Sequence, residues 1–155
     1  MALAATACAP RPTPVVQAAD PWCRATPAGA PSAACYVTLT ASADERLTGA
    51  ASPVAANLDV HSMSMDGGVM RMRQLEALDL PGDRPVALAP GGLHLMLIAP
   101  TKALTAGDTV TLTLRFGKAA PLTLQAPVRD ASEPGEDVHA LHDPHAGHGD
   151  HGTAP

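Results

Sequence analysis

The chain has 155 residues and a formal net charge of −5 at pH 7, with 46% hydrophobic but only 2% aromatic residues. This length suits one domain and a tail, and no apolar run reaches the roughly 20 residues of a transmembrane helix. The acidic balance and the lack of a basic patch exclude the electrostatic footprint of a nucleic-acid-binding protein.

The beginning of the chain, residues 1–19, is rich in Ala and Pro and shows no periodicity. An apolar stretch runs from Met1 to Ala9, but no basic residue precedes it, so we interpret residues 1–19 as a clipped export signal or as a linker behind one. Cys8 resembles a lipoprotein attachment site only weakly, because Ala5 stands where Leu is usual. An incidental cysteine in a leader is the simpler explanation, and a free and a lipid-anchored mature form both stay open.

Residues 20–128 alternate short apolar patterns with turns, and the chain contains 16 Pro and 13 Gly. In residues 109–116, for example, Val110, Leu112 and Leu114 alternate with threonines, as in a strand with one buried face. Residues 62–68 are expected to form a turn-rich loop. The expected strands are residues 22–25, 35–40, 47–51, 57–61, 69–75, 86–89, 93–98, 109–116 and 122–128. Short strands at this spacing predict an all-β domain, an antiparallel Greek-key β-sandwich.

Two cysteines lie on the first two expected strands. Cys23 and Cys35 are equally far along the chain from Gly29, the middle of the expected hairpin loop. They would therefore face each other across the two strands. Directly opposed positions are within disulfide range, and an exported protein permits the bond. Two small buried thiols are the alternative, since Cys35 shares a strand face with Val37 and Leu39.

The end of the chain, residues 129–155, has a different composition and carries the charge imbalance. Arg129 stands there against six acidic residues, and frequent Pro and Gly disfavour regular structure. Five histidines recur every three residues, namely His139, His142, His145, His148 and His151. Such a tract is typical of metal binding, and imidazole with carboxylate suits Cu(II), or incidentally Zn(II) or Ni(II). The alternative is a solubilising tail.

A second set of metal-ligand side chains lies inside the expected domain, between His61 and Met96. Imidazole and thioether together form an uncharged, soft ligand set. Such a set binds Cu(I) more favourably than it binds harder ions. Alternate side chains of a strand share a face, so His94 and Met96 lie on the face opposite Leu95. We expect an incoming ligand to be able to approach them on that face. The same alternation separates Met72 from its flanking arginines. Taken singly, each residue would be an ordinary boundary residue or, for Met72, a core gap-filler.

The spacing of these residues resembles a known signature. Ten residues separate His61 from Met72, twenty-one separate Met72 from His94, and Met96 follows two places on. This pattern is similar to that of the periplasmic copper chaperones of the PCu(A)C type, which serve the CuA site of cytochrome c oxidase. The segments that also agree with this family are residues 22–27, 36–40, 67–73 and 90–97.

The resemblance covers roughly residues 22–124 and implies a cupredoxin-like form of the β-sandwich. It also implies a periplasmic carrier whose partner is the oxidase subunit with the CuA site, with other copper carriers as further partners. The ligands of one Cu(I) would be His61, Met72, His94 and Met96.

Catalysis is not expected, because the sequence has no nucleophile elbow, no phosphate loop, no HExxH motif and no C-x-x-C pair. Two non-enzymatic functions stay open: a copper carrier, and a periplasmic protein that sequesters or buffers copper through its tail. A folded, neutral His and Met site favours the carrier, because such a site can release copper to a thiolate acceptor. Several copper ions bound per chain through the tail would favour the buffer.

Overall fold

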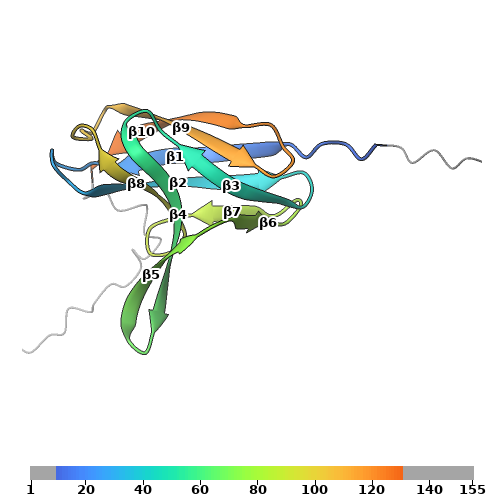
Figure 1. Cartoon of the computed structure of the whole chain (residues 1–155), viewed down its shortest axis with the longest axis horizontal. Helices are drawn as coiled ribbons and strands as arrows, with labels where there is room; N and C mark the ends of the chain where they lie inside the picture. The colour runs from blue at the N-terminus through green and yellow to red at the C-terminus, as the bar shows by residue number, and fades with distance from the viewer. Residues whose placement is uncertain (1–9, 131–155) are drawn as a thin grey trace, which may run out of the picture.

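The computed structural model describes residues 10–130, in which ten β-strands and no α-helix are present (Figure 1). The strands are β1 (Val16–Arg24), β2 (Ser32–Ala41), β3 (Glu45–Ala51), β4 (Ala55–Asp66), β5 (Val69–Leu75), β6 (Leu78–Leu80), β7 (Pro85–Leu88), β8 (His94–Pro100), β9 (Thr109–Phe116) and β10 (Leu122–Arg129). The prediction of an all-β domain is confirmed. Within this range, accordingly, no helix has the length and apolar character needed to cross a membrane.

The strands pair in the order β5-β4-β8-β2-β1-β10-β9-β3-β6, with β7 on β2. β3 also pairs with β4, through Ala50 and Leu58, so the sheet folds back on itself and encloses a core. The strand pairs are antiparallel except for β1 with β10, which run parallel where Cys23 lies beside Val128. A parallel pair needs a long connection, and the eight intervening strands provide it.

The core is built mainly from leucines on the inward faces of the strands. In β4 and β8 the register pairs Leu58 with Leu97 and Val60 with Leu95, and all four side chains are buried. Burial of one such side chain stabilises the fold by roughly 1.5–3 kcal/mol. The leucines that are shielded from solvent almost completely are Leu39, Leu47, Leu80, Leu95, Leu97, Leu104, Leu112 and Leu114. Leucine thus fills the volume that aromatic residues occupy in many other domains.

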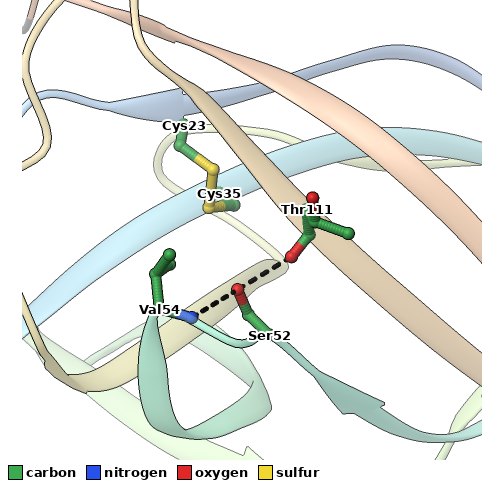
Figure 2. The surroundings of a disulfide bond; sticks show 5 residues. All are labelled: Cys23, Cys35, Ser52, Val54 and Thr111. Atoms are coloured by element: carbon green, nitrogen blue, oxygen red, sulfur yellow. Dashed lines mark hydrogen bonds between the residues drawn. A yellow bond between two sulfur atoms is a disulfide. The ribbon is translucent and has the colours of Figure 1, made fainter.

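A disulfide joins Cys23 on β1 to Cys35 on β2 (Figure 2), so these residues are not two separate thiols. The two cysteines are direct register partners and are fully buried in the core. Nearby, the Ser52 hydroxyl donates a hydrogen bond of 2.8 Å to the carbonyl oxygen of Thr111 and accepts one from the Val54 N–H. These bonds attach the turn between β3 and β4 to β9.

The first strand begins before residue 20, where we expected the domain to start. Val16 pairs with Ala41 and Ala18 with Leu39, and a register shift between Ala19 and Trp22 then interrupts the ladder. This irregularity, around Asp20-Pro21, breaks the period-2 pattern that would have revealed the strand. Residues 1–9 and the histidine-rich tail from residue 131 onward lie outside the described part of the chain.

The expected loop at residues 62–68 is wrong, because β4 continues to Asp66 and forms a hairpin with β5. The two strands are joined by Gly67 and Gly68, both with positive φ (60° and 81°), which suits a two-residue hairpin turn. Figure 1 shows that this β4–β5 hairpin extends away from the body of the sandwich. Met65, Val69 and Met70 are exposed on this hairpin, so its residues do not show the buried, apolar face that marks the other strands.

Candidate metal centre

Two histidines face each other across the neighbouring strands β4 and β8. His61 and His94 are direct register partners, and their ring centroids lie 5.7 Å apart with the ring planes at 49°. They lie on the face opposite the core, since the flanking residues Val60 and Leu95 point inward. His61 is half-buried, but His94 is only 3% exposed. Our expectation that an incoming ligand can approach His94 is therefore wrong.

A backbone carbonyl orients the His94 ring. Its Nδ1 atom lies 3.1 Å from the carbonyl oxygen of Gly92. A carbonyl oxygen only accepts hydrogen bonds, so Nδ1 carries the proton of the neutral ring and Nε2 keeps a free lone pair. Metal-binding histidines are commonly held in this way by a carbonyl or carboxylate. His94 thus presents Nε2 as a neutral donor atom.

The His61 ring is shielded from solvent without being hydrogen bonded. Neither Nδ1 nor Nε2 has a hydrogen-bond partner among residues 10–130. Buried polar atoms in native proteins are nearly always paired, so this ring is suited to a ligand. Burial lowers the pKa of His61, the adjacent His94 lowers it further, and Asp59 acts weakly in the opposite direction. The ring is therefore neutral at pH 7, the form that binds metal.

The two predicted methionine ligands differ in their distance from the histidine pair. Met96 follows His94 on the same face of β8, is half-buried, and lies opposite Asp59 of β4. Met72 lies on β5 opposite Met63 and is 49% exposed, which excludes a role in filling the core. On a flat sheet, the Cα atoms of Met72 and Met96 would lie on the order of 16 Å apart. Met72 therefore reaches an ion at the histidine pair only if the hairpin curls toward β8.

Two further side chains share the face of the histidine pair and were not assigned a role from the sequence. Met63 follows His61 on β4, and its backbone N–H donates a hydrogen bond of 3.1 Å to Gly92, so it lies closer to His94 than Met72 does. Asp59 is the register partner of Met96. A carboxylate at this position offsets the charge of a bound cation. Alternation along β4 places both residues on the face of His61, and the pairing of β4 with β8 brings Asp59 opposite Met96.

The candidate centre consists of neutral donors. Among residues 10–130, no group of three or more His, Cys, Asp or Glu side chains is placed to hold a metal ion. The described range thus offers soft thioethers and imidazoles rather than the oxygen-rich cage that Ca²⁺ or Mg²⁺ prefers. The five tail histidines lie outside the described residues, so the second predicted metal site stays a prediction.

Residues 16–128 match the family model described as "Putative lipoprotein LpqE-like". This chain belongs to the LpqE-like family. A curated relative from Leifsonia xyli subsp. xyli (strain CTCB07), named "Putative lipoprotein Lxx21020", is 31% identical over 123 residues, which are 79% of this chain and 74% of that protein. The range that matches the family model includes both histidines of the candidate centre and ends before the tail.

Solved structures similar to this LpqE-like chain are PCuAC domains. The copper-bound PCuAC domain from PmoF2 is 28% identical with a TM-score of 0.62, covering 74% of this chain and 92% of that domain. CuI-DR1885 from Deinococcus radiodurans is 28% identical with a TM-score of 0.59, covering 83% of this chain and 85% of that protein. The expected resemblance to PCu(A)C-type copper chaperones and the cupredoxin-like fold are thus confirmed.

Proposed function

We propose that this protein is a periplasmic copper chaperone that binds one Cu(I) and delivers it to the CuA centre of cytochrome c oxidase. The observation that carries the proposal is the His61–His94 pair, which leaves both His61 nitrogens and the His94 Nε2 atom for a ligand on a sheet face that also holds methionines. Neutral imidazole and thioether form a ligand set that suits Cu(I). Support comes from the likeness to PCuAC domains, one of them copper-bound.

In this proposal, Met96 and Met72 complete the coordination of copper by His61 and His94. Met96 is already beside the pair, whereas Met72 joins when the β4–β5 hairpin curls over it. Four neutral ligands leave a net charge of +1 on the site, and the carboxylate of Asp59 on the same face offsets it. A Met72→Ile variant should therefore lose affinity for Cu(I). A matched Met63→Ile variant keeps the affinity if Met72 is the ligand and loses it if Met63 takes that place.

The direction of copper transfer follows from ligand chemistry. Cysteine thiolates of a CuA site bind copper more strongly than neutral imidazole and thioether, so transfer runs downhill without an energy source. Met96 is half-buried rather than fully buried, so incoming ligands can approach the ion from its side. Residues 20–128 carry nearly balanced charge, so docking depends on local fit more than on long-range steering.

A location outside the cytoplasm is supported by two observations. The family and the curated relative are described as lipoproteins, and the fold contains a buried disulfide. Such bonds persist in oxidising compartments such as the periplasm. We therefore propose a location in the periplasm, with the protein either free or anchored by a lipid.

The histidine-rich tail motivates a second candidate function, copper sequestration or buffering for metal resistance. Its five histidines and neighbouring aspartates suit Cu(II). In a chaperone, the tail would collect scarce Cu(II) near the core site, and a reductant from elsewhere would convert it to Cu(I). In a buffer, the tail would bind most of the copper and the core would matter little.

A transfer experiment distinguishes the two functions. Protein loaded with one equivalent of Cu(I) is mixed without oxygen with a reduced apo CuA domain, and copper is measured on each protein after separation. The chaperone proposal predicts that copper moves to the acceptor. Copper that stays on the donor at equilibrium would contradict it and favour the buffer. Tail-deleted protein is the control, since a chaperone transfers its core copper without residues 131–155.

A further inference from the structure

The exposed apolar side chains of the described chain gather on one hairpin. Among residues 10–130, five large hydrophobic side chains are exposed, and four of them lie on the β4–β5 hairpin: Met65 at 71%, Val69 at 57%, Met70 at 54% and Met72 at 49%. Leaving such side chains in water forgoes the stabilisation that burial gives. Three of the four are methionines, in a chain with only six. The thioether is thus the feature that sets this surface apart.

The strand register collects these thioethers on one face. Met65 lies directly opposite Met70, and Met63 lies directly opposite Met72. Directly opposed residues share a face, with Cβ atoms about 4.5–5.5 Å apart, and neighbouring pairs along the hairpin are roughly 6.6 Å apart. Flexible methionine side chains at these separations can direct two or three sulfur atoms to one ion.

The opposite face of the hairpin keeps positive charge away from the thioethers. Ser64 is paired with Arg71, and Ser62 with Arg73. Arg71 also lies 3.5 Å from the carboxylate of Asp66, which compensates part of its charge. A cation at the methionine face therefore meets no arginine beside it.

We propose that Met65 and Met70, with Met63 as a third ligand, bind a second Cu(I) near the tip of the β4–β5 hairpin. An all-thioether set selects Cu(I) over Cu(II) and harder ions. This hairpin site is weaker than the core centre, because it is open to water and has no imidazole. The inference extends the proposed function to a second copper position, but it depends on different residues and fails or succeeds separately.

The experiment follows the methionine methyl groups of the full-length protein by NMR during anaerobic titration with Cu(I). The tail contains no methionine, so copper bound there does not obscure the readout. The first equivalent should shift Met96 and Met72, and the second should shift Met65 and Met70. Thioethers carry no proton, so the Met65 and Met70 shifts should persist at about pH 5, where free imidazoles are protonated.

Variants provide the controls. Met65→Leu/Met70→Leu keeps the apolar surface and the fold but should remove the second thioether-bound ion and leave the first in place. Ser64→Ala/Arg71→Ala changes the pair next to Met65 and Met70 on the opposite face of the hairpin and should leave both sites intact. Methyl groups of Met65 and Met70 that do not move through three equivalents, or that move in step with Met96, would overturn the proposal. Shifts of Met65 and Met70 without any shift of Met96 or Met72 would instead contradict the proposed core centre.

Discussion

Proton competition at the two histidines offers a quantitative test of the core centre. In the proposed centre Cu(I) binds the neutral imidazoles of His61 and His94, so acid should weaken binding because protons displace copper. At a pH low enough to protonate free imidazole, each histidine ligand reduces the affinity about tenfold per pH unit, or about 1.4 kcal/mol. The proposed centre has two histidines on one ion and therefore predicts a hundredfold loss of affinity per pH unit. Because burial lowers the pKa of His61, its contribution begins at a more acidic pH than that of a free imidazole.

The assay is competition for substoichiometric Cu(I) against a chelator of known pH dependence, from about pH 7 to pH 4. His61→Ala should weaken binding and reduce the limiting slope of log Kd against pH from two protons to one. Met96→Ile is the matched control, because it should weaken binding while keeping the slope at two. A His61→Ala variant that retains a slope of two would refute the placement of His61 on copper.

Three further predictions concern the fold and the tail. Burial raises the pKa of Glu45, but hydrogen bonds from backbone N–H groups outweigh it and hold the pKa below its ordinary value. Glu45→Gln should therefore destabilise the domain at pH 7, and the difference in unfolding free energy should vanish as the pH falls through the lowered pKa. Urea unfolding of both proteins at pH 7 and at acidic pH measures this difference. Replacing Cys23 and Cys35 by Ala should lower the free energy of unfolding by about 3 kcal/mol, since their separation of 12 residues closes a short loop; denaturant titration with an unchanged midpoint would contradict this. In the full chain, Cu(II) binding by the tail should fail below about pH 6.5, where free imidazoles protonate. A chain ending at Val128 should lack this Cu(II) binding. Equal Cu(II) binding by both chains in calorimetry would exclude the tail as the Cu(II) site.

Much of the fold could be predicted from local patterns. Strands β5 and β9 match the expected residues 69–75 and 109–116, because each combines a period-2 pattern with clear turn residues at its ends. The hairpin strand β4 was only half recognised. Beyond His61 its alternating residues are methionines and serines, and Met65 is exposed rather than part of the core, so the segment resembles a polar loop.

The candidate centre could likewise be predicted only in part from the sequence. Strand alternation identified the face of His94 and Met96 from the sequence alone. Alternation along one strand says nothing about which strands are neighbours, so the direct pairing of His61 with His94 required the structure. Alternation along β4 also places Asp59 and Met63 on the face of His61, but only the pairing of β4 with β8 shows that Asp59 lies opposite Met96.

The most direct test of the central claim is X-ray absorption at the copper edge of protein loaded with one equivalent of Cu(I). The proposed centre predicts a first shell of two nitrogen and two sulfur atoms around Cu(I), from His61, His94, Met72 and Met96. Met96→Ile should remove one sulfur and leave both nitrogens. A first shell made of nitrogen atoms alone, or of sulfur atoms alone, would contradict a core site built from histidine and methionine.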